Sequence, residues 1–368
     1  MSATPLSILD LSPVPAGGTV AGALRNTVDL ARQAEQFGYH RYWLAEHHLA
    51  AGVASSAPAV LIGQVAAATS AIRVGSGAVQ VGHRTALGVV EEFGTLDALY
   101  PGRIDLGLGR SGQRRTELAA EAPGTGPAGA ESSPAGDPAP PTEERVVGGL
   151  LIPPPFWYAH LVGSPRFALA SALLHQPGAQ PPPFAGQVAD ILALLRGDYR
   201  DADGLDAHAV PGEGAGVQVW LLGSSGGESA RLAGALGLPF AANYHVSPAT
   251  VLEAVATYRA AFRPSAALNR PYVSVSADVV VADTDARARR LASPYPAWVR
   301  SIRGGGGAIP FPSPERAAAD TWTDADRDLV DDRVRTQFVG APDTVTERLR
   351  VLRDVTGADE LLVTTITH

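Results

Sequence analysis

Short apolar runs alternate with longer stretches of helical periodicity along most of this chain. Between Thr19 and Gly38, apolar residues recur every three or four positions, which predicts an amphipathic helix that ends at the glycine. Several of the short runs are apolar at consecutive positions, as in strands that are buried on both faces of a parallel sheet. The strands predicted in this way cover residues 6–11, 39–45, 72–79, 103–108, 217–222, 239–243, 272–281 and 360–365.

The segments between these strands predict further helices. They cover residues 57–69, 85–100, 184–195, 228–236, 251–262, most of 284–303, and 343–355. Eight parallel strands interleaved with helices favour a closed barrel, because an open sheet of that size leaves edges to protect. We therefore predict an α/β protein with one domain over residues 1–368, a (β/α)8 TIM barrel with long insertions after strands 4 and 7. No helix follows the eighth strand before His368, so either the chain is truncated or the barrel closes without that helix.

Two segments interrupt the alternation. Residues 113–183 form a Pro/Gly-rich insertion, and within it residues 119–155 are dense in Pro, Gly, Ala, Ser and Glu. Such a composition buries too little apolar area to order itself, so we expect a partly mobile surface excursion there. The second insertion, residues 304–331, begins with four glycines followed by an apolar tip. It is either a lid that closes over a site or an ordinary flexible loop.

Composition narrows the classes of function. The chain carries a net charge of −8 and has no basic run, so nucleic acid is not an expected partner. It has no cysteine, which excludes disulfides, thiolate metal sites and cysteine nucleophiles. No segment sustains about 18 apolar residues, and the N-terminus lacks the pattern of an export signal. We expect a cytoplasmic protein that acts on a small molecule without a membrane.

Polar residues follow the second predicted strand directly, as Glu46, His47 and His48. Groups at the carboxyl ends of parallel strands line the ligand crevice of such folds. An imidazole there is suited to proton transfer, although a histidine that only caps a neighbouring carbonyl fits the pattern as well. Neighbouring side chains on a strand point to opposite faces, and no second histidine pair has ligand spacing, so no metal is expected.

Three glycine-rich segments also follow or interrupt strands. Residues 107–112 formally match a dinucleotide fingerprint but lack its helix and acidic residue, so we interpret Gly109 as space for a flat ring and Arg110 as an anion partner. Residues 75–78 predict a bulge, an unusual peptide or close ligand approach, or else a barrel-corner bend. Residues 223–227 precede a helix and predict a phosphate site rather than a mere tight turn.

Three segments together resemble the bacterial luciferase-like, flavin-dependent monooxygenases. They are residues 45–48, 74–78 and 96–110, of which 97–103 is the most specific, and the resemblance covers most of the chain outside 114–183 and 304–331. It implies a TIM barrel that binds reduced FMN, whose reaction with O2 gives a C4a peroxide. This peroxide would oxygenate an aldehyde or a hydrophobic natural product. With no NAD-binding domain in the sequence, a separate flavin reductase would supply the flavin.

The resemblance also implies roles for particular residues. His47 matches the catalytic histidine, with His48 beside it. Gly77 and Ala78 match a non-proline cis peptide under the flavin ring, and Arg110 matches an arginine near the phosphate. Ser224, Ser225, Gly226 and Gly227 match the phosphate loop, and Glu46, Ser76 and Gly109 complete the predicted cofactor-binding set. Gly109 stands where luciferase has a cysteine, and His83 is an additional imidazole near the site without an assigned role.

Two other functions remain open at this point. One is an F420-dependent enzyme of the same family that transfers hydride and consumes no oxygen. The other is a flavin-binding protein that has lost catalysis, against which the retained His47 and Arg110 count. The family commonly forms homodimers, and the small residues Ala57, Ala66, Ala67 and Ala68 would permit close contact between helices.

Overall fold

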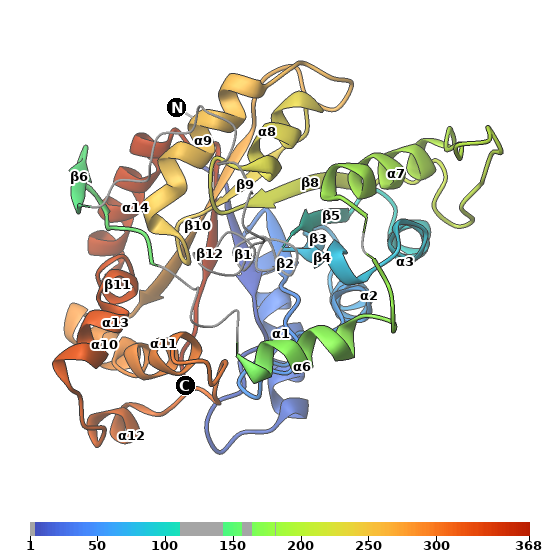
Figure 1. Cartoon of the computed structure of the whole chain (residues 1–368). Coiled ribbons are helices and arrows are strands. Elements are labelled where there is room, and N and C mark those ends of the chain that lie inside the picture. The colour runs from blue at the N-terminus through green and yellow to red at the C-terminus, as the bar shows by residue number, and fades with distance from the viewer. Residues whose placement is uncertain (1–3, 111–142, 157–163, 181) are drawn as a thin grey trace, which may run out of the picture.

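The computed structural model describes residues 4–110, 143–156, 164–180 and 182–368, and its centre is a closed parallel barrel. Each barrel strand pairs in parallel with its two neighbours, and β12 pairs back with β1, where Leu6 lies opposite Leu361. The predicted TIM barrel is therefore confirmed (Figure 1). Its strands are β1 (Leu6–Asp10), β2 (Arg41–Leu44), β3 (Arg73–Ser76), β5 (Ile104–Gly109), β8 (Gln218–Gly223), β9 (Phe240–Asn243), β10 (Val273–Val281) and β12 (Glu360–Thr364).

The predicted helices lie around these strands, as Figure 1 shows. The first helix begins where Thr19 accepts a hydrogen bond from the Gly22 N–H, the usual way in which a threonine caps a helix. Predicted and observed ends agree within one or two residues for most helices. The helices are α1 (Val20–Gln36), α2 (Pro58–Ala68), α3 (Ala86–Leu99), α7 (Phe184–Arg196), α8 (Glu228–Ala235), α9 (Val251–Ala261), α10 (Asp285–Ala292), α11 (Tyr295–Arg303) and α14 (Pro342–Thr356).

Three local expectations need correction. The predicted strand 72–79 is two pieces, β3 and the short β4 (Val79–Gln80), separated by a cis peptide between Gly77 and Ala78. The predicted helix 284–303 is divided into α10 and α11 at Ser293 and Pro294. The short strand β11 (Phe338–Gly340) was missed, and it pairs with the end of β10 outside the barrel.

The described residues of the first insertion include two strands and a helix. Arg145–Val147 (β6) and Leu150–Ile152 (β7) form an antiparallel hairpin, and Leu150 and Ile152 are buried in the main core. The expectation of a surface excursion is therefore wrong for β7, whose apolar side chains reach the core, whereas β6 is exposed as expected. Helix α6 (Pro165–Leu174) follows, while residues 111–142, 157–163 and 181 of the predicted insertion lie outside the described residues. The second insertion contains α12 (Pro314–Ala318) and the start of α13 (Asp324–Arg335).

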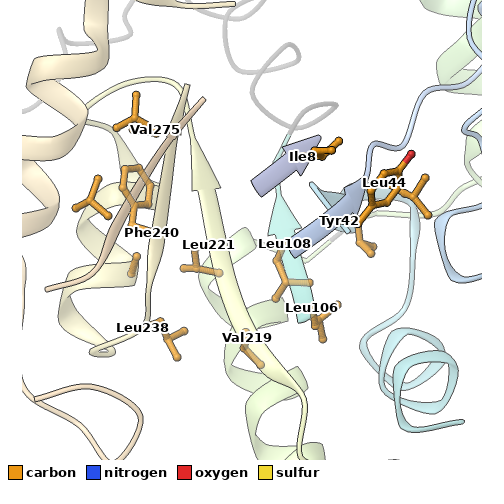
Figure 2. Close-up of a cluster of buried hydrophobic side chains, with 14 of the residues drawn as sticks. Ile8, Tyr42, Leu44, Leu106, Leu108, Val219, Leu221, Leu238, Phe240 and Val275 are labelled. Atoms are coloured by element: carbon orange, nitrogen blue, oxygen red, sulfur yellow. The ribbon is translucent and has the colours of Figure 1, made fainter. Parts of the chain in front are cut away.

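Alternate side chains of the barrel strands enter two apolar clusters. Tyr42 and Leu44 of β2 belong to the larger cluster between strands and helices, part of which Figure 2 shows. Trp43, between them, points the other way and joins Trp220 in a smaller cluster, because successive strand residues face opposite sides. Within the described residues, no helix combines the length and apolarity needed to cross a membrane.

Candidate functional site

The predicted site residues lie at the carboxyl ends of four barrel strands that are consecutive neighbours. β2 pairs with β3, β3 with β5, and β5 with β8, so the residues that follow these strands share one arc of the barrel mouth. Leu44 lies opposite Ser76, which aligns the segment that contains His47 with the Gly77–Ala78 peptide. Parallel pairing thus brings together segments that are up to about 180 positions apart in the sequence.

A surface of small residues, formed by Gly77, Ala78 and Gly109, lies where β3 and β5 end, with Gly77 and Ala78 half-buried and Gly109 buried. The Gly77–Ala78 peptide is cis, as the family resemblance implied, and the Gly77 N–H donates to the Leu44 carbonyl over 2.9 Å. Ser76 is fully buried, and its hydroxyl both donates to the Gly107 carbonyl and accepts from the Gly107 N–H, each over 3.0 Å. A Cβ on Gly109 would lie 3.1 Å from the Ala78 Cβ. Ser76 therefore supports this surface from inside the sheet and does not itself face the mouth.

The second anchor of the site is the loop between β8 and α8. Gly227 precedes α8 without a side-chain cap, which leaves N–H groups of the first turn available to an anion. Arg110 reaches this turn from β5, where its Nη1 lies 2.7 Å from the Glu228 carboxylate. A Cβ on Gly227 would lie 3.6 Å from Nη2 of Arg110. The structure therefore brings Arg110 and the predicted phosphate loop together.

Hydrogen bonds inside this loop fix its backbone. The Gly226 N–H donates to Glu253 over 3.1 Å, and Arg231 donates to the Gly226 carbonyl over 3.0 Å. Thr250 donates to the Ser224 carbonyl, and the Ser224 side chain itself is exposed. Ser225 is half-buried, so of the two predicted serines it is the more enclosed.

His47 and His48 point to different surroundings. The His47 side chain is exposed at the mouth, and its backbone N–H donates to the Ser55 carbonyl over 2.8 Å. His48 turns back to Glu46, with 2.8 Å between Nε2 and Oε1. The two histidines that were predicted as catalytic therefore have different environments, because His47 is exposed and His48 is half-buried against Glu46.

Glu46 is almost completely buried and is the centre of a polar cluster. Its Oε1 accepts from His48 and, over 3.0 Å, from Nε2 of His83, while Oε2 accepts from the Gln80 N–H. Burial raises the pKa of Glu46, but hydrogen bonds from the two histidines and Gln80, with the charge of Arg84, outweigh it and lower the pKa to about 2. In this structure Glu46 positions His48, and its predicted contact with the cofactor stays a prediction.

A third imidazole, His245, was missed by the sequence reasoning. It follows β9, and its Nδ1 lies 2.7 Å from the Ser276 hydroxyl of β10. Burial, with the nearby positive charges of Arg333 and His47, lowers the pKa of His245 to about 3, so it stays neutral. The only signal in the sequence is that His245 lies two positions after the end of β9, and its role depends on Ser276, which the fold places beside it.

The second insertion packs against the same end of the barrel. Its glycine-rich start is anchored where the Gly52 N–H donates to the Ala308 carbonyl over 2.7 Å and the Phe311 N–H donates to the Val14 carbonyl over 2.8 Å. Phe311 is fully buried and packs near Trp298. The apolar tip is therefore docked on the loops after β1 and β2, and its movement as a lid stays a prediction.

Comparison with known proteins identifies the group to which these features belong. The family described as luciferase-like monooxygenase matches residues 4–125 and 191–360. A protein of Bacillus subtilis (strain 168), Uncharacterized protein YvbT, is 39% identical over 363 residues, which is 98% of this chain and 90% of the relative. The luciferase-like monooxygenase of Escherichia coli (strain K12) is 36% identical over 360 residues, 97% of this chain and 90% of the relative.

Solved structures agree with these sequence matches. The structure of apo-MsnO8 superposes with a TM-score of 0.76 at 32% identity, covering 100% of this chain and 94% of that one. Two other solved structures have less than 25% sequence identity to this chain, so their similarity shows only a shared fold. The oxygenating constituent of 3,6-diketocamphane monooxygenase of Pseudomonas putida, in complex with FMN, has a TM-score of 0.62 at 19% identity, covering 98% and 92%. An F420-dependent secondary alcohol dehydrogenase has 0.57 at 13%, covering 99% and 93%. By its sequence matches and its barrel, this chain belongs to the luciferase-like monooxygenase family.

Proposed function

We propose that this chain is the oxygenating component of a two-component monooxygenase. It would take reduced FMN from a separate reductase and, with O2, oxygenate a hydrophobic organic substrate such as an aldehyde. The observation that carries this proposal is the set of small residues Gly77, Ala78 and Gly109 next to Arg110, whose side chain contacts the first turn of α8. FMN carries a flat ring and a phosphate group. The first feature suits the ring and the second suits the phosphate.

The ring of the flavin fits the first feature. Gly107 and Gly109 present no side chain between the Gly77–Ala78 peptide and the end of β5, and a Cβ on Gly107 would lie 2.1 Å from the Ser76 carbonyl oxygen. The close approach of β3 excludes a side chain at Gly107, and small residues at this strand end are also compatible with a ring that lies against backbone. Reduced FMN, when bound here, would supply the electrons that activate O2.

The phosphate fits the second feature. Arg110 is 10% exposed in its side chain and lies beside the first turn of α8, where the helix dipole favours negative charge. Glu228 pairs with Arg110 in this structure, so a bound phosphate would compete with that carboxylate for the guanidinium. Arg110 and the N–H groups after Gly226 are the groups that would hold the phosphate.

His47 is the residue that we assign to proton transfer. It lies exposed at the mouth, one residue after the buried Glu46, and its positive form is close enough to affect His245. An imidazole changes charge near neutral pH, so it can both accept and return a proton during turnover. His245 stays neutral and donates or accepts a hydrogen bond without adding charge.

The proposed class of substrate is supported by buried apolar residues near the same end of the barrel. Leu11, Val53, Trp298, Phe311 and Ile366 belong to one buried cluster that continues from the barrel interior to the loops after the strands. Such surroundings favour an apolar substrate and exclude water, which protects oxygenation from wasteful release of hydrogen peroxide.

Oxygen consumption tests the proposal. The purified chain is mixed with FMN, a flavin reductase and NADH, and oxygen uptake, hydrogen peroxide and the oxidised product of a long-chain aldehyde are measured. We expect substrate-dependent product with wild type and a loss of product with His47→Ala while FMN still binds. The control is His208→Ala. His208 is exposed and precedes β8, whereas the predicted phosphate loop follows that strand.

The alternative function, F420-dependent hydride transfer, is tested in a second arm of the same experiment. A fold relative binds an F420 adduct, so reduction of F420 by an alcohol is measured without oxygen. Substrate-dependent F420 reduction, with no oxygen uptake in the FMN arm, would replace the monooxygenase proposal with hydride transfer. Flavin binding with no turnover in either arm would support a binding protein instead.

A further inference from the structure

Three side chains from two segments of the chain converge on one point beside the barrel mouth. The potential ligand atoms of Glu46, His48 and His83 all lie within 4.8 Å of one another. Glu46 and His48 follow β2, whereas His83 lies in the 3-10 turn η1 (Val81–His83) after β4. We propose that these three side chains form a binding site for a divalent transition-metal ion of the zinc type. The site adjoins the proposed flavin platform, since Gln80, which contacts Glu46, lies two residues after Ala78, but its test by metal binding does not depend on the proposed function.

The spacing of the donors suits such an ion. Zinc lies about 2.0–2.1 Å from imidazole nitrogen and carboxylate oxygen, which places neighbouring ligands about 3.0–3.4 Å apart. The Oε1 of Glu46 lies 2.8 Å from Nε2 of His48 and 3.0 Å from Nε2 of His83. Both distances to Glu46 are close to this spacing, and all three donor atoms lie within 4.8 Å of one another. Two imidazoles and a carboxylate are a donor set that zinc and its first-row neighbours prefer.

The charges around the three ligands also permit a cation. Arg84 is the nearest positive side chain, with its Nε 3.4 Å from Oε1 of Glu46. Its Nη1, however, lies 3.0 and 2.9 Å from the two carboxylate oxygens of Glu92, so a second carboxylate compensates the arginine charge. The side chains of His48 and His83 are 21% and 9% exposed, which leaves a side of the cluster where water can complete the coordination.

The ligands are held in place by contacts of their own. The Gln80 N–H donates to Oε2 of Glu46 over 3.0 Å, and the Gln80 side chain donates to the Glu46 carbonyl. Gln187 donates to the Val81 carbonyl over 2.9 Å, which fixes the turn that carries His83. Such outer contacts orient ligands before the ion arrives and commonly change metal affinity by 10- to 100-fold.

The sequence predicted no metal because it compared only neighbouring histidines. His47 and His48 indeed diverge, but the imidazole that complements His48 comes from His83, 35 positions later. The ion would tie the segment after β2 to η1 and so stabilise the native state, since the unfolded chain has no such cluster.

Binding of cobalt and zinc tests the proposal. Metal-free protein is titrated with Co²⁺, whose visible absorption reports coordination by imidazole, and then with Zn²⁺ as competitor. We expect one Co²⁺ per chain, its displacement by Zn²⁺, and a thermal midpoint that rises with Zn²⁺. His83→Gln should weaken Co²⁺ binding at least tenfold.

The matched control is His208→Gln. His208 also contacts two carboxylates, Glu213 over 2.6 Å and Asp206 over 3.3 Å, but on the exposed surface. We expect it to leave the Co²⁺ spectrum unchanged. If His83→Gln does not fold, His48→Gln takes its place. Equal Co²⁺ binding by wild type and the folded ligand variant, or a spectrum that only His208→Gln abolishes, overturns the proposal.

Discussion

Arg110 at the end of β5 forms an ion pair with Glu228, the first residue of α8, over 2.7 Å. The two residues are 118 positions apart in the sequence. The barrel brings them together at the turn before α8, where we place the phosphate. The carboxylate therefore occupies part of the position that an anionic ligand needs. Removal of the Glu228 carboxylate should therefore change the affinity for FMN.

Glu228→Gln should strengthen FMN binding by about three- to tenfold, because the guanidinium of Arg110 no longer has a competing carboxylate. Arg110→Ala should weaken it by about tenfold or more, since a charge-assisted hydrogen bond is lost. Flavin fluorescence titration measures both. Riboflavin, which lacks the phosphate, is the control ligand, and equal effects on riboflavin and FMN would place the phosphate elsewhere.

Gly107→Ala should destabilise the barrel by about 3 kcal/mol or more, because the new Cβ would overlap the Ser76 carbonyl in the neighbouring strand. Gly186→Ala in α7 is the matched control, since its Cβ meets no atom within 4 Å. That change should stabilise the helix by about 0.5–1 kcal/mol. Urea denaturation gives both free energies of unfolding, and equal values for the two variants would contradict the close approach of β3 and β5.

Arg41→Met should lower the free energy of unfolding by about 3–5 kcal/mol. Arg41 lies inside the barrel, where its guanidinium contacts Asp105 over 2.7 Å and Glu360 over 3.2 Å, and all three side chains are buried. Methionine would leave both carboxylates with one positive partner fewer. As a control, Arg287→Met removes an exposed pair with Asp283 and should cost less than about 0.5 kcal/mol. Similar midpoints for the two variants in urea would argue against the network.

The stability of wild type should fall as the pH is lowered below about 6.5, in part because of His245. The folded protein holds its pKa at about 3, by burial and by the charges of Arg333 and His47, so only the unfolded chain takes up a proton between these values. This contribution is therefore complete above pH 6.5 and is lost progressively below it, by about 1–2 kcal/mol at pH 5.

His245→Gln is the variant that isolates this effect, because glutamine keeps a hydrogen-bonding group but does not titrate. Urea denaturation at pH 7 and pH 5 should show a smaller loss of stability for the variant than for wild type. Identical losses in the two proteins would mean that the pH dependence comes from other groups.

The barrel could be predicted from sequence because its signals are local. Apolar runs such as residues 103–108 and the periodicity between Thr19 and Gly38 report burial on each element without knowledge of its neighbours. The predictions from sequence were wrong where contacts with residues distant in the sequence decide the local structure. The β6–β7 hairpin is ordered because Leu150 and Ile152 reach the core, although the surrounding composition indicates a surface loop.

The residues of the candidate site also fall into those that the sequence identified and those that it did not. His47, Arg110 and the loop 223–227 could be selected from sequence, because each directly follows an apolar strand and carries the residue types that its chemistry needs. His83 and His245 could not be assigned, since their significance depends on the partners that the fold places beside them. Those partners, Glu46 and Ser276, are each more than 30 positions away.

The sequence by itself determined the order of strands and helices and the residues at the strand ends, because hydrophobic periodicity is a property of each segment. Only the tertiary structure decided which strand ends are neighbours and which way each side chain turns once its strand has ended. His47 faces the mouth and His48 faces Glu46, although they are adjacent in the chain. The physical reason is that the backbone after a strand is fixed by hydrogen bonds to other parts of the fold, such as that from the His47 N–H to the Ser55 carbonyl, rather than by the spacing of residues.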